Sequence, residues 1–292
     1  MSAVRELRLD SSGLTALDPA IFRSEGLELL SAYQNRIGFL PPHVARLAPT
    51  LHTLNLADNR LTAVPSELGL LRTLHTLDLA HNQITELPEE MGDLSGLTRY
   101  LYVADNQLSA LPSALCRLVR LRYLGATDNR LTTLPSELGA MAGLCELRLY
   151  RNRIATLPAS LGRLPSLREL HLMENQLEFL PDELGGLTDL RELRLMDNRL
   201  RALPRSLGDL HRLTRLDLRN NQLPELPGTV AGLRALTHLD LRNNRLQHLP
   251  EDALAALPLL EKLDLRWNPL ELGRETEAWV CGLEQRGCVV LL

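Results

Sequence analysis

Leucine and other aliphatic residues recur along the chain in a fixed pattern of short and long gaps. Ahead of Asn59, apolar residues stand at Leu51, Leu54 and Leu56, and Leu61 follows, which gives the pattern LxxLxLxxNxL. Leu54 and Leu56 are two residues apart, so they point to one face of a short strand while their neighbours point to the other face. The pattern therefore predicts a short strand with one buried face in each unit.

An asparagine marks the same place of this pattern along nearly the whole chain, at intervals of 23 or 24 residues. The positions are Asn35, Asn59, Asn82, Asn106, Asn129, Asn152, Asn175, Asn198, Asn221, Asn244 and Asn268. An earlier unit carries Ser12 in this place. Such a period indicates a solenoid, because one unit cannot bury its own leucines but stacked neighbours can. We expect each asparagine amide to bond backbone groups that the turn after the strand leaves unpaired.

The second half of each unit follows the pattern LPxxLGxLxxL. Its prolines are Pro65, Pro88, Pro112, Pro135, Pro158, Pro181, Pro204, Pro227 and Pro250. Proline lacks an N–H and has a fixed φ, which suits the start of a short helical turn. The prolines are therefore expected on the segment that returns from one strand to the next.

Together the two half-patterns resemble the leucine-rich-repeat family over nearly the whole chain. The LPxxLGxLxxL half is similar to the cytosolic 23-residue class, which includes Ras-suppressor-like proteins, plant intracellular Ras-group proteins and many bacterial proteins. The resemblance implies an α/β solenoid curved as a horseshoe, with a parallel β-sheet on the concave face and short helical or 3-10 turns on the convex face. It also implies a role as adaptor or scaffold, with a small GTPase or another signalling protein as partner.

The end of the chain departs from the repeat and predicts a cap. We expect a solenoid of about twelve repeats over residues 1–272 and a cap over residues 273–292, with a helix and a last edge strand, because terminal repeats must cover the open core. Trp279 and Leu283 stand at helical spacing. Trp279 is expected to be largely buried against the leucines of the last repeat, near Leu263 and Leu265.

Composition and charge exclude several classes of protein. The chain of 292 residues is 45% hydrophobic and 23% charged, with a net charge of −4, and it shows no basic face of the kind that binds nucleic acid. No apolar run approaches the roughly 20 residues that span a bilayer. The first residues lack the basic and apolar regions of a signal peptide. We therefore expect a cytoplasmic monomer that binds neither nucleic acid nor the membrane interior.

The cysteines and the scarcity of lysine bear on the compartment. The four cysteines (Cys116, Cys145, Cys281 and Cys288) form no paired clusters of the extracellular kind, so reduced thiols are expected. Lys262 is the only lysine, while arginine is abundant. A GC-rich bacterial genome explains this together with the scarcity of isoleucine and phenylalanine. The sharper alternative is a bacterial effector that lost lysines to escape ubiquitination in a host cell.

No sequence motif points to catalysis. The chain has no histidine or cysteine pair and no carboxylate cluster at metal-ligand spacing, and no GxSxG, phosphate loop or Cys–His–Asp arrangement. We therefore expect no catalytic residue, no metal and no cofactor.

The solvent-facing places of the strands are the candidate binding surface. Numbering the pattern LxxLxLxxNxL, the third, fifth, seventh and eighth places face solvent on the concave side, and all five tyrosines stand there. Tyrosine, methionine and arginine are enriched at interface cores. The predicted partner-binding residues are Tyr33, Tyr100, Tyr102, Tyr123, Arg148, Tyr150, Arg151, His171, Met173, Arg194, Met196, Arg219 and Trp267. The alternative is that these are tolerated strand residues without a partner.

Two finer expectations concern this surface. We predict one continuous exposed patch, formed by Tyr102, Tyr123, Tyr150, Met173 and Met196. One extra residue between Leu97 and Leu101 predicts a local bulge beside the tyrosines.

An aspartate column (Asp217, Asp240 and Asp264) stands beside an arginine column (Arg219, Arg242 and Arg266) in the last repeats. The two columns are expected either to neutralise each other or to steer a partner.

These patterns favour a non-enzymatic protein-binding module that recognises its partner through the concave face. The alternative is the substrate-recognition arm of a ubiquitin ligase or a kinase whose catalytic part is absent from this chain. The partner's identity is not encoded in any of the patterns.

Overall fold

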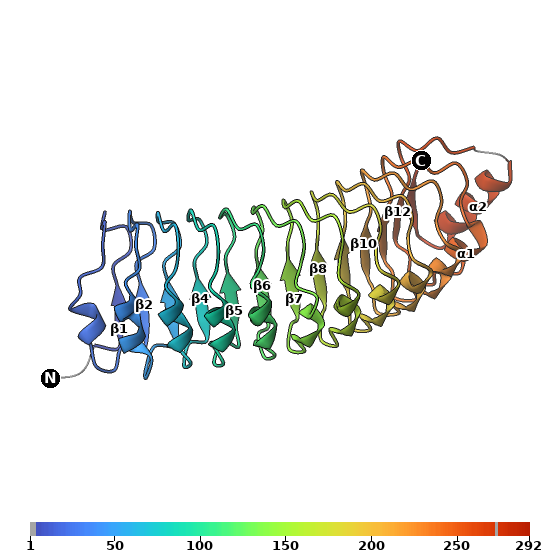
Figure 1. Ribbon diagram of the computed structural model, residues 1–292. Coiled ribbons are helices and arrows are strands. Elements are labelled where there is room, and N and C mark those ends of the chain that lie inside the picture. The colour runs from blue at the N-terminus through green and yellow to red at the C-terminus, as the bar shows by residue number, and fades with distance from the viewer. Residues whose placement is uncertain (1–3, 272–273) are drawn as a thin grey trace. The chain divides into compact units, whose positions relative to one another are not determined.

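The computed structural model of the protein describes residues 4–271 and 274–292. The chain divides into two compact units, residues 1–152 and 153–292. Within each unit, short strands alternate with short helices along the sequence (Figure 1). The expected boundary between repeats and cap, at residues 272 and 273, lies outside the described residues.

The first unit is a parallel sheet whose strands follow one another in sequence order. Its strands are β1 (Glu6–Arg8), β2 (Leu29–Ser31), β3 (Thr53–Asn55), β4 (Thr76–Asp78), β5 (Tyr100–Tyr102), β6 (Tyr123–Gly125) and β7 (Glu146–Arg148). Its returning segments carry the 3-10 helices η1 (Ile21–Arg23), η2 (Pro42–Leu47), η3 (Ser66–Leu70), η4 (Glu89–Asp93), η5 (Ser113–Arg117) and η6 (Leu138–Ala140). Neighbouring strands pair residue for residue, so equivalent places of successive repeats form columns across the sheet.

The second unit continues the same design and ends in two α-helices. Its strands are β8 (Glu169–His171), β9 (Glu192–Arg194), β10 (Arg215–Asp217), β11 (His238–Asp240), β12 (Lys262–Asp264) and β13 (Val289–Leu291). Its helices are η7 (Ala159–Arg163), η8 (Asp182–Gly186), η9 (Arg205–Asp209), η10 (Gly228–Gly232), α1 (Glu251–Ala255) and α2 (Arg274–Gln285). The predicted class, a solenoid with parallel strands on one side and 3-10 turns on the other, is confirmed in both units.

Leucines and the asparagine ladder hold each repeat to the next. Leu54 and Leu56 are fully buried, and burial of one such side chain stabilises the fold by roughly 1.5–3 kcal/mol. The Asn59 amide Nδ2 donates to the Leu56 carbonyl at 3.1 Å and to the Ala32 carbonyl of the preceding repeat at 2.9 Å. Its Oδ1 accepts the Ile37 N–H at 2.9 Å. The prediction of buried, backbone-bonded asparagines is confirmed from Asn35 to Asn244, whereas Asn268 bonds backbone carbonyls but is only half-buried.

The turn after each strand has a conformation that the sequence analysis did not anticipate. The residue at the eighth place has a positive φ in each of twelve repeats, from Ser11 at 53° to Trp267 at 62°. Asparagine and aspartate tolerate this left-handed region best, and they occupy half of these places. That enrichment is the sequence signal that could have revealed the turn.

The proline ladder lies on the returning segments, as predicted. Pro65 is extended, with φ −74° and ψ 150°, and stands just before η3. Its carbonyl accepts the Leu68 N–H at 3.0 Å, which closes the first 3-10 turn. The missing proline N–H is therefore not required by the helix.

Close packing between successive returning segments explains the glycine of LPxxLG. A Cβ on Gly92 would lie 2.1 Å from the Ala114 carbonyl oxygen, which excludes a side chain there. Cys116 takes the equivalent place one repeat later and is buried. The next helix, η6, is shorter than its neighbours and begins only at Leu138.

Two expectations about irregular segments are wrong in detail. The extra residue before Tyr100 makes no bulge, because β5 pairs residue for residue with both β4 and β6. The loop that enters the strand absorbs it without breaking the ladder. The C-terminal helix and last strand are present, but Trp279 is only half-buried and donates its Nε1–H to the Glu251 carbonyl of α1 at 3.0 Å. Among the described side chains of this end, Leu283 and Cys288 are buried.

Candidate functional site

The candidate site is the strand face, defined here as the side of each sheet on which the third, fifth and seventh places lie. Because the strands pair in register, residues of one place line up about 4.8 Å apart from strand to strand. The face therefore presents columns of side chains whose chemistry changes along the chain.

Three tyrosines gather on the strand face of the first unit. We call Tyr100, Tyr102 and Tyr123 the tyrosine cluster. The Tyr100 and Tyr102 rings are stacked, with centroids 5.7 Å apart and an angle of 12°. Tyr123 lies tilted against both, at 4.8 Å from Tyr102 and 5.8 Å from Tyr100. Tyr100 remains 44% exposed, so the cluster presents aromatic surface to solvent.

Gly125 makes room for this arrangement. It occupies the fifth place of β6, directly opposite Tyr102 in the strand pairing. A Cβ at Gly125 would lie 2.8 Å from both the Cε1 and the hydroxyl oxygen of Tyr123, so the Tyr123 ring lies over the glycine. The ring is partly withdrawn from water, and this burial raises the pKa of Tyr123 to about 12, although the nearby Arg148 charge lowers it. The Arg148 guanidinium stands 5.7 Å from the Tyr123 ring centroid, within cation–π range.

The other predicted residues of the first unit lie outside the cluster. Tyr33 is 40% exposed, and its N–H donates to the Asp10 carboxylate at 2.9 Å. Tyr150 is half-buried and makes no ring contact among the described residues. Arg151 occupies a left-handed turn position, with its Nη1 3.6 Å from the Asp128 carboxylate.

Burial in the second unit corrects part of the predicted partner-binding surface. His171 and Met173 are only 6% and 8% exposed, so neither is a projecting side chain. Methionine is flexible enough to lie down along the sheet, where it fills space instead of presenting a contact. Met196 is half-buried, and its sulfur accepts Arg219 Nη2 at 2.7 Å. The patch as one continuous surface therefore fails at Met173.

Arg194 and Trp267 also have defined neighbours. Arg194 pairs with the Glu192 carboxylate of its own strand. Trp267 is 69% exposed, and the Arg266 guanidinium lies 5.5 Å from the centroid of its ring. Trp267 is therefore the predicted site residue of the second unit that projects most clearly into solvent.

The aspartate and arginine columns neutralise each other, as one of the two interpretations predicts. Arg219 Nη2 lies 3.2 Å from the Asp217 carboxylate, and Arg242 Nη2 lies 2.6 Å from that of Asp240. The Asp264 carboxylate, 1% exposed as a side chain, meets Arg266 Nη2 at 2.7 Å and Arg242 Nε at 3.4 Å.

These pairs act differently on the carboxylates. Burial raises the pKa of Asp217, helped by the Asp240 charge and opposed by Arg219. Burial would also raise the pKa of Asp264, but the Arg266 hydrogen bond and the Arg242 and Arg266 charges outweigh it and lower that pKa below its ordinary value. Neighbouring arginines therefore compensate the negative charge of Asp264 well and that of Asp217 less well.

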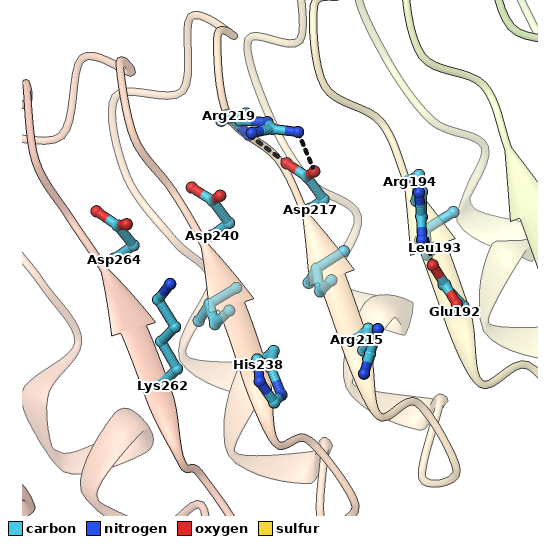
Figure 2. A pocket seen from close by; sticks show the side chains of 12 residues that line it. Glu192, Leu193, Arg194, Arg215, Asp217, Arg219, His238, Asp240, Lys262 and Asp264 are labelled. Carbon is cyan, nitrogen blue, oxygen red and sulfur yellow. Dashed lines mark hydrogen bonds and ion pairs between the residues drawn. The ribbon is translucent and has the colours of Figure 1, made fainter. Parts of the chain in front are cut away.

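A hollow of about 270 Å³ lies over β9 to β12 on this face. In Figure 2 the aspartates stand at the ends of their strands, and Arg215, His238 and Lys262 stand at the beginnings of theirs. Within the described part of the chain, Arg215 and Lys262 make no ion pair. This row of basic side chains can bind negatively charged groups. It was not among the site residues predicted from the sequence.

One group with metal-ligand geometry also escaped the sequence analysis. Glu169, His171 and Glu192 come from the neighbouring strands β8 and β9, and each offers one ligand atom within 4.8 Å of the others. Spacing along the sequence does not reveal this grouping, because strand pairing unites Glu169 and Glu192, which are 23 positions apart. Arg194 nevertheless forms an ion pair with the Glu192 carboxylate, and the positive charge of Arg194 disfavours a metal cation at this site.

Membrane insertion through a helix finds no support in the described residues. The longest helix, α2, has 12 residues and carries charged side chains, so none of the described helices could cross a bilayer.

Two protein-family models match the repeats of this chain. A family model described as a leucine-rich repeat region matches residues 109–199 and 181–271, which together cover more than half of the chain. A second model, described as a leucine rich repeat, matches residues 49–108. A search among curated proteins found no match.

Solved structures from bacteria and plants share the fold. A leucine-rich-repeat protein of Leptospira interrogans is 25% identical, with a TM-score of 0.68, over 99% of this chain and 96% of that one. The ectodomain of the Arabidopsis thaliana receptor kinase GASSHO1/SCHENGEN3, solved with CASPARIAN STRIP INTEGRITY FACTOR 2, is 31% identical, with a TM-score of 0.79. The match covers 99% of this chain and 38% of that one. An internalin of Listeria monocytogenes, 21% identical with a TM-score of 0.70 over 99% of this chain and 86% of that one, shares the fold.

Proposed function

Because the chain belongs to the leucine-rich-repeat family, we propose that it is a non-enzymatic protein-binding module whose strand face recognises a partner protein. Domains of this family are typically non-catalytic. The plant receptor ectodomain was solved with a bound partner, which supports the same use of this chain's repeats.

The tyrosine cluster is the observation that carries the proposal. Its rings stack at 5.7 Å while Tyr100 stays 44% exposed, and an exposed aromatic cluster adds nothing to the leucine core that holds the repeats together. Buried aromatic anchors at interfaces each contribute about 2 kcal/mol or more to binding. The rings are held against one another and against Gly125, so little conformational entropy remains to be lost on binding.

The partner class follows the resemblance of the LPxxLGxLxxL half to the cytosolic group. We infer an adaptor or scaffold that acts in the cytoplasm on a signalling protein such as a small GTPase. Cys116, Cys145, Cys281 and Cys288 are all free thiols, which supports a reducing compartment. The effector hypothesis, in which the partner belongs to a host cell, is supported by Lys262 being the only lysine.

Affinity capture with purified wild type and the Tyr102→Ala/Tyr123→Ala double variant tests the proposal. A captured protein is identified, purified and titrated against both forms. We expect the double variant to bind at least about thirtyfold more weakly, as loss of about 2 kcal/mol implies. Phe179→Ala is the matched control, because this aromatic is 58% exposed but lies outside the strand face. Equal binding by the double variant and wild type would remove the tyrosine cluster from the site.

A second candidate function is the recognition arm of a larger enzyme. The observation that favours it is the likeness to the ectodomain of a receptor kinase, of which this chain matches 38%. In that case the strand face serves the same binding role, and the catalytic part lies on another segment or another chain.

A further inference from the structure

Four aspartates occupy the fifth place of the strands, and one of them differs from the rest. In three of them an arginine stands two residues further on, at the seventh place, and forms an ion pair with the aspartate. These three are Asp217, Asp240 and Asp264. Asp78 of β4 has Ala80 at that place. The same backbone therefore builds an aspartate–arginine pair three times in the second unit and leaves it incomplete in the first.

The Asp78 carboxylate has no counter-charge of its own. Its Oδ1 accepts the Ala80 N–H at 3.0 Å, and among the described residues it forms no ion pair. His81 carries its Nδ1 3.0 Å from the Asp105 carboxylate. Burial raises the pKa of Asp78, opposed by the Ala80 hydrogen bond and the His81 charge. A half-buried carboxylate without a cation is a costly arrangement that a partner's cation would relieve.

The surroundings of Asp78 favour one kind of cation. Asp78 pairs with Tyr102 in the strand register, and both side chains stand on the strand face. Tyr102 stands one strand further along the same column as Asp78, and Tyr100 stacks on Tyr102 at an angle of 12°. A guanidinium is planar, binds a carboxylate through two parallel N–H groups and stacks on aromatic rings, whereas an ammonium does neither as well.

We propose that Asp78, Tyr100 and Tyr102 form a subsite for a basic side chain of the partner, an arginine. The guanidinium takes the place next to Asp78 that Arg219, Arg242 and Arg266 take next to their own aspartates, and it lies against the tyrosine rings. The inference rests on the proposed function, because it names what the partner brings to the strand face. A metal ion is disfavoured, because Asp78 is a single carboxylate without further ligands.

An isolated arginine derivative tests the subsite without any partner protein. N-acetyl-arginine amide is titrated into the full chain while NMR follows the ring signals of Tyr100 and Tyr102 and the carboxyl signal of Asp78. We expect saturable shifts that the neutral citrulline analogue does not produce. Asp78→Asn should weaken binding by about tenfold or more, while Asp58→Asn, on the neighbouring repeat, should leave it unchanged. Shifts equal for arginine and citrulline, or unchanged in Asp78→Asn, would overturn the proposal.

A second variant fills the subsite from within. Ala80→Arg places an arginine where the fold already accepts one in three other repeats, and it should pair with Asp78. We expect the pKa of Asp78, read from its carboxyl signal, to fall and binding of the arginine derivative to drop by about tenfold or more. Ala80→Gln is the matched control, because it adds a long polar side chain at the same place without the positive charge. An Ala80→Arg protein that binds as wild type contradicts the subsite.

The outcomes separate this inference from the proposed function. If a captured partner depends on the tyrosine cluster but binds Asp78→Asn as well as wild type, the arginine subsite is wrong and the binding module stands. If the arginine derivative binds at Asp78 but no protein depends on the cluster, the chemistry of the subsite stands and the proposed function fails.

Discussion

The ring of Tyr123 lies over Gly125, two residues along its own strand, because the glycine offers no side chain at the place opposite Tyr102. A Cβ there would stand 2.8 Å from the ring's Cε1 and from its hydroxyl oxygen. The tyrosine cluster thus depends on a residue that has no side chain of its own.

Gly125→Ala should displace the Tyr123 ring and open the cluster. The clashing atoms belong to the far end of a side chain, so the ring can swing away and the free energy of unfolding should change by no more than about 1 kcal/mol. Since burial holds the pKa of Tyr123 at about 12, a displaced ring should titrate closer to its ordinary value of 10.0. A titration of the Tyr123 ring signal by NMR measures this. An unchanged pKa would show that the ring does not depend on Gly125.

Asn152→Ala should destabilise the fold. Asn152 Nδ2 donates to the Ala126 and Leu149 carbonyls at 2.9 and 3.0 Å, and its Oδ1 accepts the Leu131 N–H at 3.0 Å. Removal of the amide leaves these buried groups unpaired, at a cost of roughly 1–3 kcal/mol. Urea unfolding should show the loss, and the exposed Arg130→Ala should not. A melting midpoint equal to that of wild type would contradict the role of the ladder.

Asp264→Asn should destabilise the last repeats in a pH-dependent way. The pKa of Asp264 is lowered in the folded protein, so its charge stabilises the fold above the ordinary value of 3.8, and this contribution is lost as pH falls through the folded pKa. Loss of a buried carboxylate beside two arginines should cost about 2–4 kcal/mol at pH 7. Urea unfolding of both forms at several pH values measures the difference, which should shrink toward acid pH. A difference that grows on acidification would contradict the pairing.

Trp267→Asn should stabilise the fold slightly. Trp267 has a φ of 62° and is 69% exposed, so its bulk strains the turn without filling the core. Asparagine tolerates the left-handed region, and the relief should amount to about 1 kcal/mol. Chemical denaturation tests this, with Asn243→Ala as the opposite change at an equivalent turn. A less stable Trp267→Asn protein would show that Trp267 packs more than its exposure suggests.

The four thiols should react at very different rates. Burial, aided by the charges of Glu137 and Glu89, raises the pKa of Cys116 to about 11, so little thiolate forms near neutral pH. Burial also raises the pKa of Cys288, while Cys281 is exposed. Alkylation at pH 8 followed by peptide mass spectrometry should label Cys281 first and Cys116 and Cys288 last. Early labelling of Cys116 would contradict its burial.

The periodic residues determined the repeat by themselves. A leucine at the fourth or sixth place has one environment whatever the neighbouring sequence, and each asparagine meets the same backbone groups in every repeat. Strands, returning segments and the asparagine ladder could therefore be predicted from spacing alone. The same spacing also predicts that Tyr100, Tyr102 and Tyr123 lie on one face of the sheet.

Only the tertiary structure decided what each exposed place does. The burial of Met173 depends on how its flexible side chain lies along the sheet, and the half-burial of Trp279 depends on its neighbours in the folded protein. The spacing of residues along the sequence determines neither. The Glu169–His171–Glu192 grouping arises because strand pairing brings distant residues within ligand distance. The sequence shows that Asp78 lacks the arginine that follows Asp217, but only strand pairing sets the Asp78 carboxylate beside Tyr102 and its stacked partner Tyr100. The sequence therefore determined the columns, and the contacts between neighbouring strands determined the site.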